Sequence, residues 1–142
     1  MYQIHQTYFF AQKRLEHKLL LAKGVTFSQF LILFGLQCKE ASSQTEVAQF
    51  LHLTEATVSR HLATLEKGKY LTRKEDPNNR RKHVLALTAK GQKAFAKAHG
   101  VIENELKDIF GPIPKKDRAL IADAFEQVLA KLLQKQATNS QS

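Results

Sequence analysis

The sequence predicts a mainly α-helical protein of the α+β class, with six helices and one small β-hairpin. Apolar residues recur at steps of three and four along most of the chain, which is the period of amphipathic helices. Two short helices with clear start signals follow each other between residues 43 and 67, and alternating apolar residues follow a turn-forming cluster at 76–79. A chain of 142 residues is long enough for one domain with its own core.

The first two predicted helices differ in how their apolar residues are arranged. A second helix over residues 28–40 is apolar on nearly every side, so we expect it to be buried in the core. The first helix, which Gly24 ends, has a single apolar stripe. That stripe consists of Ile4, Tyr8, Ala11, Leu15, Leu19 and Ala22.

Two consecutive short helices come next. Ser43, followed three residues later by Glu46, is the pattern of a capping box and predicts a helix start. Thr54 is a good N-cap for a second helix over residues 55–67, and Gly68 is its C-terminal stop. Two short helices joined by a turn of about four residues match a helix-turn-helix, whose second helix enters the major groove of DNA.

The outward face of this second helix distinguishes it from an ordinary helical hairpin. With Val58, Leu62 and Leu65 directed inward, the residues left outside are short hydrogen-bonding side chains and one guanidinium. Such groups suit the edges of base pairs, whereas long Glu and Lys pairs are expected on a helix that only faces solvent. A merely exposed helix face is the alternative. The outward residues are Thr57, Arg60, His61 and Thr64, with Glu55 and Ala56 at the leading end.

The densest positive charge lies in the predicted hairpin. Strands are expected over residues 70–74 and 83–87, and the DPNNRR segment between them contains Asp, Pro and Asn residues that favour turns. Residues 60–100 have 11 basic and 3 acidic side chains, so +8 of the formal charge of +9 lies there. We expect Arg80 and Arg81, at the hairpin tip, to contact the DNA backbone and the minor groove. A solvated basic surface is the alternative.

The C-terminal part is predicted to be two long helices, over residues 89–109 and 115–135, with a break at Gly-Pro-Ile-Pro. Their apolar stripes are too broad for a domain of residues 25–88 to cover, so a second copy of the chain is expected to pack there. The expected organisation is therefore an N-terminal dimerisation helix (1–24), a winged helix-turn-helix domain (25–88), C-terminal dimerisation helices (89–135) and a disordered polar tail (136–142).

The segment TEATVSRHLATLEKGKYLTRKEDPNNRRKHVLALTAKG resembles the MarR family of bacterial winged-helix transcription regulators, and the resemblance covers essentially the whole chain. The shared motifs are a recognition helix that ends in a Leu-Glu-x-x-Gly-like turn, a strand with Arg73, a wing close to Asp-Pro-x-Asp-Arg-Arg, and Leu-Thr-x-x-Gly at the next helix. One position departs from the family pattern: Asn79 stands where an Asp often braces the wing.

The resemblance implies an obligate homodimer, in which the N- and C-terminal helices form the interface. Two winged lobes would bind a pseudo-palindromic operator in double-stranded DNA. A small-molecule effector, a redox change or a metal typically alters the spacing of the lobes in this family.

The predicted DNA-contact residues lie in three segments. Ser43, Gln44 and Thr45 are at a helix N-terminus, where backbone amides attract phosphate, with plain capping as the alternative. The second and third segments are the recognition helix and the wing. Their residues are Glu55, Ala56, Thr57, Ser59, Arg60, His61 and Thr64, and Arg73, Asn78, Asn79, Arg80, Arg81 and Lys82.

Candidate residues for three further kinds of site are present. Phe9, His17 and Phe34 are candidates to line an effector pocket where the first, second and fifth helices meet. Cys38 is a candidate oxidant sensor, although a buried structural cysteine is the more usual case. His99 and Glu103 stand at i and i+4, but without further ligands at recognisable spacing no metal site and no cofactor are predicted.

Enzyme and membrane classes are not supported. The chain has no glycine-rich phosphate loop, no nucleophile elbow and no paired carboxylates in an apolar setting. It has no apolar run of about 20 residues and a single cysteine, so we expect a cytoplasmic protein without an intrachain disulfide. The sequence thus predicts a sequence-specific transcription regulator, namely a ligand- or signal-responsive repressor. The alternative is a non-specific, nucleoid-type structural DNA-binding protein.

Overall fold

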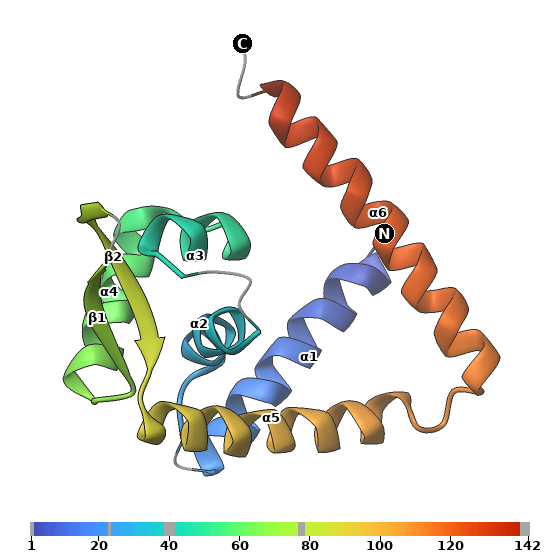
Figure 1. Ribbon diagram of the computed structural model, residues 1–142. Coiled ribbons are helices and arrows are strands. Elements are labelled where there is room, and N and C mark those ends of the chain that lie inside the picture. Colours follow the sequence, from blue (N-terminus) through green and yellow to red (C-terminus); the bar gives the residue numbers. More distant parts are fainter. Residues whose placement is uncertain (1, 23, 39–41, 77–78, 140–142) are drawn as a thin grey trace. The chain divides into compact units, whose positions relative to one another are not determined.

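Six α-helices and one antiparallel pair of strands make up the described part of the computed structural model, which comprises residues 2–22, 24–38, 42–76 and 79–139 (Figure 1). This architecture confirms the predicted mainly α-helical class with a small β-wing. In chain order the elements are α1 (Tyr2–Leu21), α2 (Phe27–Gln37), α3 (Gln44–Leu51), α4 (Glu55–Lys67), β1 (Leu71–Asp76), β2 (Asn79–Leu87), α5 (Ala89–Phe110) and α6 (Lys115–Asn139).

The helix α2 starts at a capping box that the sequence analysis missed. The Thr26 hydroxyl accepts a hydrogen bond from the Gln29 amide at 3.2 Å, and the Gln29 side chain accepts one from the Thr26 amide at 3.1 Å. The helix ends at Gln37 with Cys38 as its C-cap, three residues before the predicted end. As predicted for a helix that is apolar on nearly every side, its apolar side chains are buried or half-buried.

The helices α3 and α4 form the predicted helix-turn-helix. The Ser43 hydroxyl accepts a hydrogen bond from the Glu46 amide at 3.3 Å. The return contact differs from a capping box, because the Glu46 carboxylate accepts bonds from the amide and the hydroxyl of Ser42, each at 2.7 Å. His52 turns the chain with φ at 52°, in the left-handed region, and Thr54 caps α4 as predicted.

The exit from α4 is a tight turn at Gly68 and Lys69. Gly68 has a helical φ of −74°, and the residue with positive φ is Lys69, at 61°. Glycine is required at position 68 for space, since a Cβ there would lie 2.6 Å from the ring of Tyr70. The predicted stop at Gly68 is thus correct in position, but the left-handed capping residue is Lys69. The amides of Lys69 and Tyr70 donate to the carbonyls of Glu66 and Leu65, each at 2.9 Å, which closes the end of the helix.

The wing strands are longer than predicted. The strand β2 begins at Asn79, so the backbone of Arg80 and Arg81 belongs to a strand and not to the hairpin tip. The tip is residues 77–78, which lie outside the described residues. Glu75 is opposite His83, whereas the next residue, Asp76, is opposite Asn79, so the register shifts beside the two arginines.

The wing is attached to the helical body near the base of the hairpin. Leu71 and Leu85 are buried in the core, and the Leu85 amide donates to the Ser42 carbonyl at 2.7 Å, which ties β2 to the segment before α3. At the base of the hairpin the Thr88 hydroxyl donates to the Lys69 carbonyl at 2.7 Å. These contacts hold the hairpin beside α3 and α4, as Figure 1 shows.

The core lies within the first of two compact units, Met1–Asn104. An aromatic group at its edge joins α2 to α5, with the Phe30 and Phe95 rings stacked at 5.8 Å between centroids. The predicted inward residues of α4 are part of this core. The buried hydrophobic residues of the described chain are Leu15, Leu19, Val25, Phe30, Ile32, Leu33, Val47, Ala48, Val58, Leu62, Leu65, Leu71, Leu85, Ala98 and Ile102.

The second unit, Glu105–Ser142, contains the end of α5 and all of α6. The boundary between the units falls inside α5. The helix α6 continues to Asn139, so residues 136–139 of the expected disordered tail are helical, and residues 140–142 lie outside the described residues. Residues 134–137, Gln-Lys-Gln-Ala, are good helix formers and favour helix beyond the predicted end at residue 135.

Replacing Gly91 with Ala should destabilise the protein by about 1–3 kcal/mol or more, because the new Cβ would lie 1.9 Å from the Tyr70 carbonyl oxygen. Chemical denaturation at one protein concentration measures this. The matched control is Gly100→Ala in the same helix, where a Cβ meets nothing within 4 Å and removal of a helical glycine should leave stability unchanged or raise it. Equal effects of the two substitutions would contradict the packing of α5 on Tyr70.

Candidate nucleic-acid interface

The recognition helix α4 has one buried and one exposed face. Val58, Leu62 and Leu65 have no exposed surface, as predicted. Of the residues predicted to point outward, Thr57 and His61 are half-buried at the edges of the exposed face. The exposed residues of the helix are Glu55, Ala56, Ser59, Arg60, Ala63, Thr64 and Lys67.

Ala63 is an exposed residue that the sequence analysis missed. It lies three positions after Arg60 and seven after Ala56, so the helical period alone places it on the same face. The side chain of alanine has no polar group, so the sequence pattern gave no sign that Ala63 could contact DNA. An exposed methyl group is nevertheless a means of contact with a base, since thymine presents a methyl group in the major groove.

The polar side chains of this face are oriented by short-range hydrogen bonds. The Thr54 and Thr57 hydroxyl oxygens lie 2.9 Å apart, and Arg60 Nη2 donates weakly to Thr57 Oγ1 at 3.5 Å, toward the start of the helix. Thr64 Oγ1 donates to the Arg60 carbonyl at 3.1 Å. The Thr64 hydroxyl proton is therefore engaged, so this side chain is left mainly as an acceptor.

The start of α3, the start of α4 and the wing line a cleft of about 520 Å³. The Thr45 hydroxyl donates to Glu55 Oε1 at 3.1 Å and links the two helices. The fold thus brings together five of the predicted DNA-contact residues. These are Ser43, Gln44, Thr45, Glu55 and Arg73, joined in the cleft by Glu46, Gln49, His83 and Leu85.

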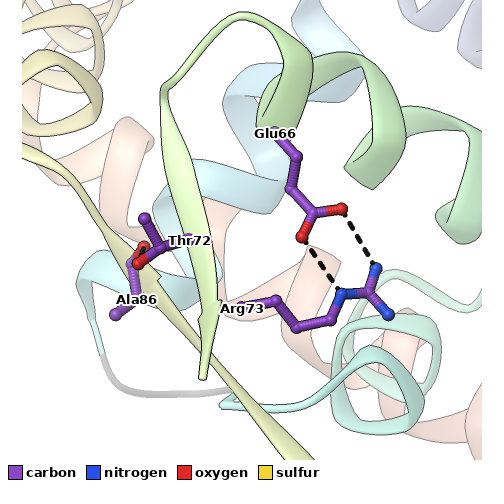
Figure 2. A network of polar contacts seen from close by, with 4 residues as sticks. All are labelled: Glu66, Thr72, Arg73 and Ala86. Carbon is purple, nitrogen blue, oxygen red and sulfur yellow. Dashed lines mark hydrogen bonds and ion pairs between the residues drawn. The ribbon is translucent and has the colours of Figure 1, made fainter. Parts of the chain in front are cut away.

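Arg73 is held by an ion pair inside the protein (Figure 2). Its Nε donates to Glu66 Oε1 at 3.1 Å and its Nη2 to Glu66 Oε2 at 3.3 Å, and this forked pair joins β1 to α4. Nearby, the Thr72 hydroxyl donates to the Ala86 carbonyl at 3.5 Å. The structure shows Arg73 as a brace between the wing and α4, and its contact with DNA stays a prediction. Contact with DNA would have to use its remaining N–H groups.

The basic end of the wing is only partly described. Asn78 lies outside the described residues. Asn79, Arg80, Arg81 and Lys82 have a described backbone, in β2, but their side chains lie outside the description. Their contact with DNA therefore stays a prediction based on charge and on their position in the strand.

The three candidate effector residues have different surroundings in the described part of the chain. Phe9 is half exposed, at 51%, and packs edge-on against Phe10. Phe34 is half-buried in the aromatic group, 6.4 Å from Phe50 between ring centroids. His17 lines a separate cavity of about 310 Å³, with Glu16, Leu20, Gly24, Val25 and Thr26. A role of these residues in effector binding therefore stays a prediction.

Cys38 is exposed, contrary to the more usual buried state. His99 is half-buried against the Phe95 ring, 5.4 Å between centroids. Within the described residues, no group of three His, Cys, Asp or Glu side chains is placed to hold a metal ion. No helix among the described residues combines the length and apolar composition that a bilayer crossing requires.

Apolar side chains are exposed on α1 and on α6. Tyr8 and Phe10 of α1 are 68% and 59% exposed, and Phe125 of α6 is 59% exposed. The group on α1 consists of Tyr2, Ile4, Tyr8, Phe9, Phe10, Leu20 and Leu21, and the group on α6 of Leu120, Phe125, Val128, Leu129, Leu132 and Leu133. A monomer rarely exposes so many large apolar side chains, so these faces are candidates for an interface.

Comparison with protein families gives a match to the model of the MarR family over residues 25–83. The uncharacterized HTH-type transcriptional regulator YdgJ of Bacillus subtilis is 25% identical over 105 residues, covering 74% of this chain and 64% of that protein, so the match spans less than two thirds of YdgJ. Transcriptional regulator HosA of Escherichia coli O111:H- is 24% identical over 132 residues, and the match covers 93% of this chain and 93% of HosA.

Solved structures share the fold. The transcriptional repressor CouR, bound to a 23-mer DNA duplex, superposes with a TM-score of 0.77 at 25% identity, covering 93% of this chain and 90% of CouR. BpsR of Bordetella bronchiseptica, whose DNA binding is regulated by 6-hydroxynicotinic acid, has a TM-score of 0.79 at 23% identity, covering 89% of this chain and 90% of BpsR.

A double-mutant cycle on the Glu66–Arg73 pair should give a coupling free energy of about 0.2–1 kcal/mol, because both side chains are 31% exposed and solvent screens the pair. The cycle compares wild type with Glu66→Gln, Arg73→Gln and the double variant, each unfolded with urea at one protein concentration. The coupling free energy should be smaller at high salt, because salt screens the ion pair. Lys74 and Glu75 supply the control cycle, since adjacent strand residues point to opposite faces. A coupling that is absent, or is equal in both cycles, would show that the pair does not brace the wing.

Proposed function

We propose that the chain is a winged helix-turn-helix transcription regulator of the MarR family, and that it is a homodimeric repressor that binds a pseudo-palindromic operator. Membership of this family implies a DNA-binding regulator and not an enzyme. The proposal adds repression, the dimer, the operator symmetry and release by a signal. A regulator acts where the DNA is, so the proposal also places it in the bacterial cytoplasm.

The exposed face of α4 is the observation on which the proposal rests. Arg60 offers a guanidinium whose paired donors match guanine O6 and N7, and Ser59 offers a hydroxyl. Ala56 and Ala63 are small enough to let the helix approach the bases closely. A protein that binds DNA without sequence preference needs phosphate contacts but no such face.

Phosphate contacts are proposed for the segments on either side of α4. Gln44 and Thr45 lie at the start of α3, where backbone amides favour an anion. Arg80, Arg81 and Lys82 of β2 belong to the segment with 11 basic and 3 acidic residues. These groups would fix the position of α4 in the groove while contributing most of the salt-dependent affinity.

The homodimer is proposed from the exposed apolar faces of α1 and α6. Covering these faces by a second copy removes apolar surface from water and stabilises the pair by roughly 25 cal/mol for each Å² buried. A two-fold dimer presents two recognition helices, so its operator is expected to have two half-sites related by symmetry.

We propose a small molecule as the signal. Support comes from BpsR, a protein of this fold that 6-hydroxynicotinic acid regulates. The cavity beside His17, at about 310 Å³, is at the lower end of the usual size for ligand pockets. The exposure of Cys38 favours oxidation of a thiol as the second candidate signal.

Selection from a pool of random-sequence duplexes, followed by footprinting, tests the proposal. The expected result is a two-fold motif with half-site centres about 10 base pairs apart, bound about 10³-fold or more tightly than random DNA at one fixed salt concentration. Uniform protection without a motif would contradict the proposal and favour the non-specific, nucleoid-type alternative.

Replacing Arg81 with Ala should weaken binding to all sequences alike and reduce the slope of log affinity against log salt by about 0.9 for each phosphate that the arginine neutralises in the wild-type complex. Binding is measured by fluorescence anisotropy across a salt series. Lys116→Ala is the control, because it removes one exposed positive charge from α6, outside the basic segment, and should leave the slope unchanged. An unchanged slope in the Arg81 variant would remove this arginine from the DNA contacts.

A further inference from the structure

We infer that Glu55 selects cytosine at one position of each operator half-site, an inference that rests on the proposed function. Glu55 is the first residue of α4 and is exposed. The first residues of a recognition helix are those that contact base edges in the major groove. Glu55 therefore stands where a side chain contributes to sequence preference.

The chemistry of a carboxylate restricts which base Glu55 can contact. An ionised carboxylate accepts hydrogen bonds and donates none. In the major groove cytosine presents a lone amino donor at N4, whereas guanine presents two acceptors that repel a carboxylate. Adenine has a donor at N6, but its N7 acceptor lies beside it, so cytosine is the better partner.

The two carboxylates of α4 differ in how their charge is balanced. Glu66 is paired with Arg73 through two hydrogen bonds. Among the residues that the structure describes, Glu55 has no basic side chain within ion-pair distance, and the group that donates to it is the neutral hydroxyl of Thr45. A negative charge at the DNA-facing end of a helix is repelled by phosphates unless it meets a hydrogen-bond donor, and the cytosine amino group is such a donor.

Thr45 orients the carboxylate before DNA binds. Its hydroxyl donates to Oε1 of Glu55 at 3.1 Å, and this bond leaves Oε2 for a base. Thr45 is held on α3, which buries Val47 and Ala48 in the core. The positive end of the α4 dipole further favours an ionised side chain at this position. Thr45 is thus a positioning residue for Glu55.

The inference is tested by measuring the base preference at every half-site position for wild type and for Glu55→Gln. Selection from random duplexes identifies the preferred bases, and competition binding then measures each preference. Wild type should prefer cytosine at one position roughly tenfold to a hundredfold over other bases. Glu55→Gln should move this preference to adenine, because a Gln amide reads N6 and N7 together, and should leave the other positions unchanged. Thr45→Val should reduce the cytosine preference several-fold.

Glu75→Gln is the charge-matched control. It removes an exposed carboxylate from β1, so it should raise affinity for all sequences without a change in base preference. If Glu55→Gln behaves like Glu75→Gln, the carboxylate acts only through its charge and the inference is overturned, although the proposed operator binding stands. If wild type selects no motif, the proposed function and the inference both fail.

Discussion

The burial of Val58, Leu62 and Leu65 in the core is the constraint on which the rest of the interface depends. These three side chains lie on one face of α4 and have no exposed surface, so the rotation of the helix about its axis is fixed. Because successive residues turn by 100°, that rotation decides which residues face outward, and it places Arg60 between two exposed alanines. The hydrophobic core thereby determines which chemical groups are available to a base pair.

The wing depends on the same core for its position. A two-stranded hairpin is marginally stable by itself, so its direction is set by what it is attached to. It is attached to the core by buried Leu71 and Leu85. The Leu85–Ser42 backbone hydrogen bond ties it to the segment before α3, and the Glu66–Arg73 ion pair ties it to α4. Arg73 has its guanidinium engaged with Glu66 even though it lies in the basic segment. Net charge along the sequence thus overstates the charge that is free to meet phosphate.

Hydrophobic burial is complete in one part of the chain and incomplete in another. Within the unit Met1–Asn104 the apolar faces of α2, α3 and α4 meet one another, whereas α1 and α6 each leave a row of large apolar side chains exposed. The proposed second copy would cover these rows. It would also double the number of recognition helices, so the same apolar surface accounts for both the dimer and a two-fold operator.

Sequence patterns are enough to predict the helices, the helix-turn-helix caps at Ser43 and Thr54, the inward residues of α4 and the existence of a wing. Local patterns suffice for these features, because helix period and capping depend on residues three or four positions apart. Four features become visible only in the folded chain: the Arg73 partner, the exposure of Cys38, the different surroundings of Phe9, His17 and Phe34, and the bond between Thr45 and Glu55. Each of these depends on residues of different elements that packing brings together, and one sequence contains no local signal for such contacts.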